Sequence, residues 1–212
     1  MAIPSVRELP FISASQSTFS LDPGTSIARH GKGLAGTVSQ IREAVWTMRL
    51  ETPRLEHPVR NQWQAWHHTL RGGLRFFLAW DISRAEPRAY PNGVPEILAA
   101  TWNGEGTVAS LATPGQIDAS GVPAGFQLMI GDRVGLVEGG RYGYFDVAED
   151  ATADGSGNIS VTVEPLVQDV FTASAAVVFR RPKVKMQIVN GSFESTSTFD
   201  LTPVSFDAVQ VI

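Results

Sequence analysis

The chain has 212 residues, of which 43% are hydrophobic and 18% are charged, a balance typical of a globular protein rather than a disordered one. It contains no cysteine, which excludes disulfide bonds, thiolate zinc sites and cysteine nucleophiles. No segment approaches the roughly 20 apolar residues of a membrane helix, and the first residues, MAIPSVRELP, lack the pattern of a secretory signal. We therefore expect a soluble protein that is made without an export signal and does not insert into a membrane.

The net charge of −4 is distributed unevenly along the chain. Residues 1–90 hold eleven Lys and Arg against seven Asp and Glu, whereas residues 91–212 hold six against fourteen. This split suggests two parts with surfaces of opposite charge. In a self-assembling protein, the basic part of one copy could then face the acidic part of a neighbouring copy. The alternative is that the uneven distribution arose by chance and serves only solubility. Because the Lys and Arg residues form no dense stripe, nucleic acid is not an expected partner.

The first recognisable elements are strands. Residues 18–21 (TFSL) end at Asp22-Pro23-Gly24, a turn signature. In residues 45–51 (VWTMRLE), Trp46, Met48 and Leu50 alternate with smaller or polar residues, which places the large apolar side chains on one face of a strand. We expect both segments to belong to one sheet.

A helix is predicted over about residues 58–71. Pro58 suits the first turn, and Val59, Trp63, Trp66 and Leu70 form one apolar stripe at helical spacing. Gly72 and Gly73 then end the helix, because glycine readily takes the left-handed conformation of a C-terminal cap.

A strand is predicted directly after this helix, because the spacing of apolar residues changes from helical to alternating. Leu74, Phe76, Leu78 and Trp80 would share the apolar face of that strand. Together with Trp63, Trp66 and Leu70 they are the predicted helix–sheet core. Arg71 and Arg75 flank the corner, where they could face a neighbouring subunit or only solvent.

Prolines at positions 87, 91 and 95 indicate a connector, which we place at residues 91–103. Residues 104–181 then read as short alternating strands separated by Gly, Asp and Asn turns, typical of antiparallel hairpins in a small barrel or sandwich. The sequence is thus mainly β with one amphipathic helix.

The candidate catalytic and metal-binding residues are few. His67 and His68 are adjacent, so on a helix their side chains diverge by roughly 100° and cannot share one metal ion. His57 and Asp81 could orient a histidine, but the Gly-x-Ser-x-Gly elbow of a hydrolase is absent. We expect no enzymatic activity, no cofactor and no metal.

Two further clusters of residues can each be interpreted either as a binding site or as ordinary structure. Residues Asp150, Asp154, Ser156 and Asn158 are rich in oxygen and could hold calcium, but their spacing fits a hairpin tip better. The aromatic residues Trp102, Tyr142 and Tyr144 could stack on sugar rings, although Tyr142 and Tyr144 also fit one face of a half-buried strand.

Several long runs resemble the tail proteins of long-tailed bacteriophages. They are WQAWHHTLRGGLRFFLAWDISRAEPRAYP (63–91), VPAGFQLMIGDRVGLVEGGRYGYFDVAEDATADGSGNISVTVEPLV (122–167), FRRPKVKMQI (179–188) and DLTPVSFDAVQ (200–210). The first combines an aromatic helix, LRGG, an aromatic strand and an exit rich in arginine and proline. Together they cover most of the chain, and the family they indicate is the siphophage distal tail protein, the hub ring of the tail tip, or a closely related minor tail protein.

The resemblance implies a β-sandwich domain with a helix at residues 1–90, forming a ring that is hexameric in that family. It also implies a peripheral β-barrel or sandwich at 104–181 and C-terminal strands at 182–212 that could return to the first domain. The expected partners are other copies of the chain, the tail-tube protein and the hub or baseplate proteins, with host-surface carbohydrate as the alternative. The expected location is the virion tail tip, after synthesis in the cytoplasm of the bacterial host.

Overall fold

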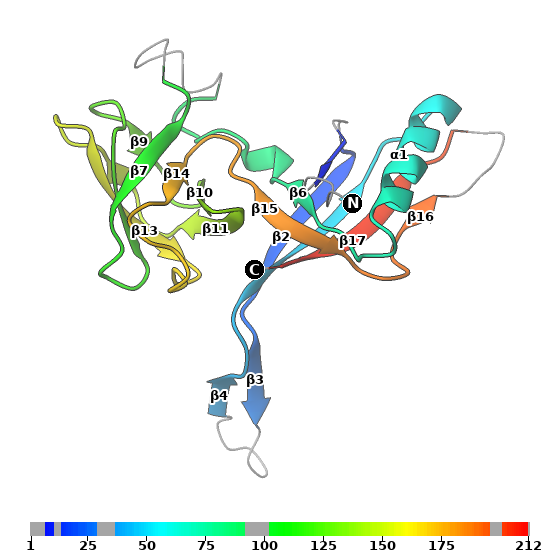
Figure 1. Ribbon diagram of the computed structural model, residues 1–212, viewed down its shortest axis with the longest axis horizontal. Coiled ribbons are helices and arrows are strands. Elements are labelled where there is room, and N and C mark those ends of the chain that lie inside the picture. The colour runs from blue at the N-terminus through cyan, green and yellow to red at the C-terminus, as the bar shows by residue number, and fades with distance from the viewer. Residues whose placement is uncertain (1–6, 11–13, 29–36, 92–101, 196–200, 212) are drawn as a thin grey trace. The chain divides into compact units, whose positions relative to one another are not determined.

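The computed structural model describes residues 7–10, 14–28, 37–91, 102–195 and 201–211, and the chain divides into two compact units. The first unit runs to Phe77 and takes in Met186–Val211, and the second is Leu78–Lys185. The first unit is therefore built from two segments that are distant in the sequence, with the second unit inserted between them (Figure 1).

Within the described residues, the first unit contains a sheet of seven strands in the order β1-β6-β15-β17-β5-β2, with β16 beside β17. β2 pairs with β5, β5 with β17 and β17 with β15, and all three pairs are antiparallel. The centre of the sheet thus joins strands from both ends of the chain. The strands are β1 (Arg7–Glu8), β2 (Gln16–Asp22), β5 (Val45–Glu51), β6 (Phe77–Ala79), β15 (Val184–Ile188), β16 (Glu194–Ser195) and β17 (Val204–Gln210).

The two faces of this sheet differ in burial. In β5, Trp46, Met48 and Leu50 are buried while Arg49 between them is exposed. In β17, buried and half-buried residues alternate in the same way, with Phe206 at the centre of the buried set. Successive side chains of a strand point to opposite faces, so the apolar side chains gather on one face of the sheet. The predicted alternation of residues 45–51 is confirmed.

Helix α1 (His57–Thr69) packs on the apolar face through its tryptophans. The ring centroid of Trp66 lies 5.6 Å from that of Phe206 and 5.1 Å from that of Phe77, and Trp63 lies 6.0 Å from Phe206. Leu70 is fully buried one turn further along. Aromatic pairs at these separations stabilise a core by about 0.5–1.5 kcal/mol each beyond the effect of area burial. These contacts fix the helix against the sheet.

The helix ends in a tight turn in which Arg71, Gly72 and Gly73 all have positive φ angles, of 51°, 63° and 92°. The φ angle of Gly73 favours glycine, and a Cβ atom there would also lie in tight contact, 3.2 Å from the backbone oxygen of Ile188. The Gln187 side chain donates to the Gly73 oxygen at 2.6 Å. The corner is thereby attached to strand β15.

The predicted strand face after the helix is partly wrong. Leu74 is 80% exposed, Phe76 and Trp80 are only half-buried, and Phe77, which alternation placed on the opposite face, is fully buried against Trp66. The turn occupies the residues up to Arg75, so β6 begins later than predicted, and its three side chains, those of Phe77, Leu78 and Ala79, are all buried.

The second unit contains a closed antiparallel barrel in the order β10-β11-β13-β8-β7-β14. Its interior is filled by aliphatic and aromatic side chains such as Val134, Leu136, Phe145 and Val161. The strands are β7 (Glu105–Ser110), β8 (Gln116–Ser120), β10 (Arg133–Glu138), β11 (Arg141–Val147), β13 (Asn158–Glu164) and β14 (Ala176–Val178), and β9 (Gln127–Leu128) pairs separately with β12 (Ala151–Thr152). Closure of a barrel removes the exposed strand edges of an open sheet.

The predicted fold class was mainly β, with a β-sandwich that carries one amphipathic helix and a second small antiparallel barrel or sandwich. The mainly β class, the helix and the closed barrel are confirmed. In place of a sandwich, the described residues of the first unit form one seven-stranded sheet on which the helix packs. The unit boundaries differ from the predicted domains. The division between the units falls inside β6, so residues 80–90, assigned by prediction to the first domain, belong to the second unit. The C-terminal strands β16 and β17 share a sheet with β2 and β5, so they return to the first domain as the prediction allowed. Of the predicted connector 91–103, residues 92–101 lie outside the described part of the chain.

We predict that Trp66→Ala lowers the free energy of unfolding of the first unit by about 3–5 kcal/mol, because it leaves a cavity beneath the helix. Urea unfolding followed by circular dichroism measures this loss. Leu74→Ala, at the exposed corner, is the matched control and should change stability by less than about 0.5 kcal/mol. Equal losses in the two variants would contradict the assignment of the helix–sheet core.

Candidate functional site

A short segment of the second unit, Asp81–Tyr90, lies along the outside of the barrel and is called the strap below. It begins with the 3-10 turn η1 (Ile82–Arg84), for which Asp81 is the N-cap. The Asp81 carboxylate accepts hydrogen bonds from the Ser83 backbone N–H at 3.0 Å and from the Ser83 hydroxyl at 2.6 Å. This capping turns the chain sharply as it leaves strand β6.

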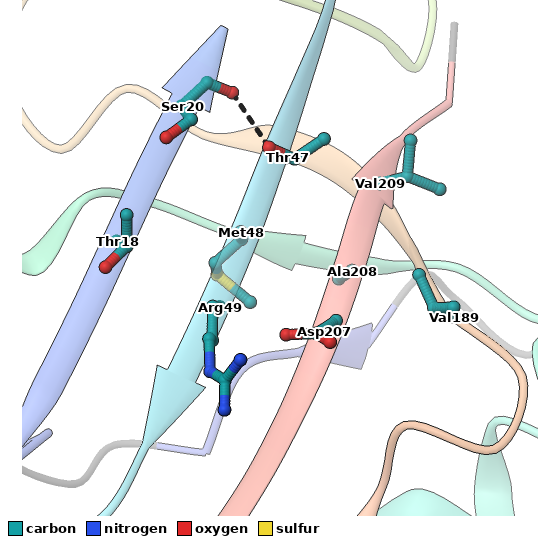
Figure 2. A pocket seen from close by; sticks show the side chains of 9 residues that line it. All are labelled: Thr18, Ser20, Thr47, Met48, Arg49, Val189, Asp207, Ala208 and Val209. Carbon is teal, nitrogen blue, oxygen red and sulfur yellow. Dashed lines mark hydrogen bonds between the residues drawn. The ribbon is translucent and has the colours of Figure 1, made fainter. Parts of the chain in front are cut away.

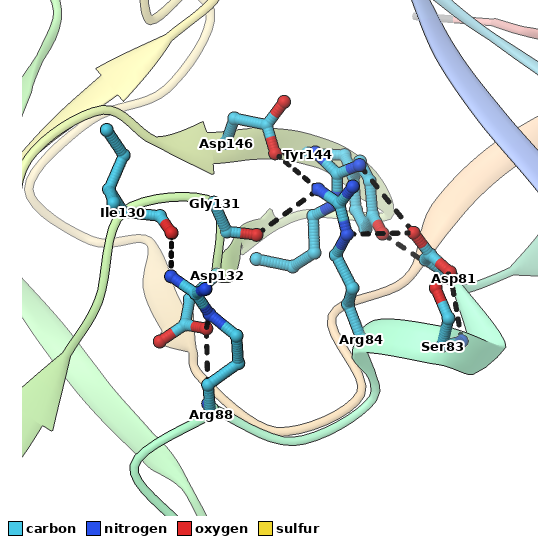
Figure 3. A network of polar contacts seen from close by, with 10 residues as sticks. Asp81, Ser83, Arg84, Arg88, Ile130, Gly131, Asp132, Tyr144 and Asp146 are labelled. Carbon is cyan, nitrogen blue, oxygen red and sulfur yellow. Dashed lines mark hydrogen bonds and ion pairs between the residues drawn. The ribbon is translucent and has the colours of Figure 1, made fainter.

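The first half of the strap is held by a cluster of charges, of which Arg133 and Asp81 are buried (Figure 3). Arg133 on β10 is 3% exposed, and its guanidinium lies 3.6 Å from the Asp81 carboxylate and also pairs with Asp146 on β11. Arg84 of the strap lies 3.7 Å from Asp81 and 3.4 Å from Asp146. Two cations and two carboxylates therefore neutralise one another at the barrel surface.

Tyr144 completes this cluster. It lies on the outer side of β11, is 1% exposed, and its hydroxyl accepts a hydrogen bond from the Asp81 backbone N–H at 3.3 Å. Burial raises the pKa of Tyr144 well above its usual value, so the phenol stays neutral. Burial also lowers the pKa of Arg133, while the nearby Tyr144 and Asp81 act in the opposite direction. The guanidinium depends on its carboxylate partners to remain buried as a cation.

The second half of the strap is anchored by Arg88. Its backbone N–H and its side chain both donate to the buried Asp132 carboxylate, at 3.1 and 3.3 Å, and its guanidinium also donates to the Ile130 oxygen. The other Asp132 oxygen accepts the Met129 N–H at 2.8 Å. Asp132 thus attaches the strap to the loop that precedes β10.

Glu86 and Tyr90 add the remaining contacts. Glu86 pairs with Arg180 at 2.7 Å, and the Arg181 N–H donates to the Ala85 oxygen at 2.6 Å, so the strap also contacts the chain segment that leaves the barrel. The Tyr90 hydroxyl accepts the Gln127 N–H at 2.8 Å. The strap is the exit segment of the sequence that is rich in arginine and proline. Its polar residues bind it to its own unit.

The histidines that the sequence raised as weak candidates have other contacts in the described structure. His57 lies 2.8 Å from the Arg60 guanidinium, and Asp81 contacts arginines. The His67 ring stacks on Phe193 with centroids 4.0 Å apart, and burial, followed by the charge of His68, lowers the pKa of His67. The sequence alone did not indicate Arg133 as the partner of Asp81, because Arg133 comes from a strand about 50 residues later.

The oxygen-rich segment near Asp154 forms a turn. One Asp154 carboxylate oxygen accepts the backbone N–H groups of Ser156 and Asn158, at 2.8 and 2.9 Å. Asp150 instead accepts the Ile130 N–H at 2.7 Å. The part of the chain that the structure describes contains no group of three His, Asp or Glu side chains placed to hold a metal ion.

The proposed glycan contacts are not brought together as one exposed surface. Tyr144 is buried under the strap, which contradicts its predicted role as a sugar contact. Trp102 is half-buried, packs edge-on against Phe126 with centroids 4.9 Å apart, and donates its indole N–H to the Glu105 oxygen at 2.7 Å. Tyr142 is half-buried in β11 opposite Val137.

The two arginines at the helix corner differ in their surroundings. Arg71 is exposed, with its backbone in the left-handed region. Arg75 is half-buried, and its guanidinium donates to the Thr69 oxygen at 3.2 Å, near the negative end of the helix dipole. Arg75 is thus engaged by its own helix, whereas Arg71 remains on the surface.

A second candidate site is a shallow groove on the face of the sheet opposite α1 (Figure 2), called the open face below. Thr47 and Arg49 come from β5, and Asp207 and Val209 from the adjacent β17, where Arg49 and Asp207 lie directly opposite each other. Thr18 and Ser20 of β2 line its side, and Thr47 donates to the Ser20 oxygen at 3.1 Å. The groove joins opposite charges, hydroxyls and a few apolar groups, a mixture found at protein–protein contacts.

The chain matches no family model, and no curated protein sequence matches it. In the described part of the structure, no helix is long and apolar enough to cross a membrane.

We predict that Arg133→Met lowers the free energy of unfolding of the barrel unit by about 3–5 kcal/mol, because it leaves the buried Asp81 carboxylate without its buried cation. In a double-mutant cycle with Asp81→Asn, the two losses should be non-additive by about 1–3 kcal/mol. Urea unfolding of the four proteins provides the values. The control is Arg141→Met, which replaces an exposed arginine on β11. Strictly additive losses for the Asp81 and Arg133 variants would contradict the described pairing.

Proposed function

We propose that this chain is a structural protein of a long-tailed bacteriophage that assembles into a ring at the distal end of the tail. The ring, hexameric if it follows the family that the sequence resembles, would join the tail tube to the tail-tip or baseplate proteins. The protein would act through its interfaces, without catalysis or a cofactor, and would be located in the virion tail tip after synthesis in the host cytoplasm.

The observation that carries this proposal is the open face of the first unit. The sheet is stiffened on one side by α1, while Thr18, Ser20 and Arg49 on the opposite side are exposed. A rigid, mixed polar surface of this kind is suited to contact with another folded protein. Each copy of a closed ring needs such rigid surfaces at fixed angles, since rotational symmetry repeats the same contact around the axis.

The charged cluster of the barrel unit also supports a structural role for the protein. This cluster is paired within the unit, because Arg133 contacts Asp81 of the strap and Asp146 of β11. A network of paired charges within one unit is typical of a group that holds structure together. The sequence resemblance implies a peripheral position for this unit in the ring.

The two halves of the chain also differ in charge, with an excess of basic residues before residue 91 and of acidic residues after it. Charge asymmetry of this kind favours unlike surfaces meeting in an assembly and disfavours like ones. This would bias the order in which the ring stacks on its neighbours above and below.

We predict that the purified chain forms closed rings of uniform mass. Size-exclusion chromatography with light scattering gives the mass, and negative-stain images show whether the particles are annular. Addition of isolated tail tubes should place the ring at one tube end. A strictly monomeric protein that also fails to bind tail tubes would contradict the proposal.

A further inference from the structure

A two-stranded ribbon extends the hairpin formed by β2 and β5 beyond the main sheet (Figure 1). It consists of β3 (Thr25–Ala28) and β4 (Thr37–Gln40), paired in antiparallel register, and is called the ribbon below together with the adjoining Ile41. Since β3 and β4 form a sheet of their own, the ribbon has no third strand in the described structure.

The base of the ribbon is fixed by contacts around Gly24. The Gly24 oxygen accepts the N–H groups of Ile41 and Arg42 at 2.9 and 3.3 Å, and Asp22 accepts the Gly24 N–H and pairs with Arg42. Gly24 has a φ angle of 63°, and a Cβ atom there would lie 2.4 Å from the Arg42 oxygen. Glycine is therefore required where the ribbon leaves the sheet, so its starting direction is defined.

The ribbon carries apolar side chains that are exposed in the described part of the structure. Val38 is 60% exposed and Ile41 is 69% exposed, and the described side chains of Thr25, Ser26 and Ser39 are exposed as well. A two-stranded hairpin is only marginally stable in water unless a third strand or a packed surface supports it. The exposed apolar residues on a ribbon with a fixed base indicate that a partner surface covers it.

The groove on the open face offers a complementary surface. Val189, which lines it, is 43% exposed, and Val209 beside it is half-buried. Arg49 and Asp207 lie opposite each other, so their charges balance. The described side chains from 38 to 41 are uncharged, so they can lie over this pair without like-charge repulsion.

We propose that the ribbon of one copy packs into the groove on the open face of a second copy. This inference rests on the proposed ring, because a cyclic assembly of identical subunits needs two different surfaces on each copy that fit one another head to tail. Val38 and Ile41 would be buried against Val189 and Val209. The ribbon is the element that reaches the neighbour, and the groove is its receptor.

Cysteine cross-linking tests the contact directly, because the chain has no cysteine of its own. Val38→Cys and Val209→Cys are placed on separate full-length chains that carry tags of different mass, mixed under assembly conditions and oxidised. A mixed-tag disulfide dimer should form about tenfold faster than in a mixture of Val38→Cys with Ser160→Cys, whose cysteine replaces an exposed serine of the barrel. Equal rates in the two mixtures would overturn the proposal.

A charge-insertion variant tests the same contact without new bonds. Val38→Asp with Ile41→Asp should raise the concentration at which half the chains assemble by about tenfold or more, because two apolar contacts are lost. Leu166→Asp with Val170→Asp adds the same charge at exposed apolar positions of the barrel and should assemble normally. Circular dichroism checks that all variants are folded.

The outcomes separate this inference from the proposed ring. Wild-type rings whose assembly is unchanged by the ribbon variant would overturn the ribbon contact and leave the ring standing. A wild-type chain that stays monomeric at every concentration would overturn both. Rings lost in the ribbon variant and kept in the barrel control, with selective cross-linking, are the expected result.

Discussion

A sheet has two faces, and the main constraint on this protein is that helix α1 covers only one of them. The contacts of Trp63 and Trp66 with Phe206 and Phe77 bury the apolar face and hold the helix in place. The face that carries Arg49 and Asp207 remains polar and open to contact. Because the covered face is rigid, the open face is rigid as well, and a surface of fixed shape is what a repeated subunit contact requires. The ring proposal and the ribbon contact both follow from this arrangement.

In the barrel unit, the main interaction is the one that binds the polar strap to the closed barrel. The strap supplies Asp81, Arg84 and Arg88, and the barrel unit supplies Arg133, Asp146 and Asp132 as their respective partners. Removing two opposite charges from water is favourable only when their pairing and hydrogen bonds are good, so this network favours one position of the strap over others. Tyr144, suggested by sequence as a sugar contact, belongs to this structural network.

The sequence predicted the period of the helix and of β5 but not the contacts between elements. The spacing of Trp63, Trp66 and Leu70 located the helix, and the alternation of Trp46, Met48 and Leu50 located β5, because each period follows from local geometry. The strand after the helix was misplaced because three residues with positive φ lengthen the turn, and only Gly72 and Gly73 suggested this in advance. The pairing of Asp81 with Arg133 depends on how the barrel closes, which local spacing does not encode. The Arg-rich exit was recognised as a pattern, but its function as a strap needed the structure.

Hydrogen exchange of the full-length chain, measured by mass spectrometry at concentrations below and above assembly, tests the central claim most directly. The claim is that the first unit is completed by contact with other copies of the chain, whereas the strap is already complete within its own unit. Exchange should slow on assembly in the ribbon and in β17 beside the groove, while amides of the strap should be equally protected at both concentrations. Assembled particles in which the ribbon and β17 exchange as fast as in the monomer would contradict the account.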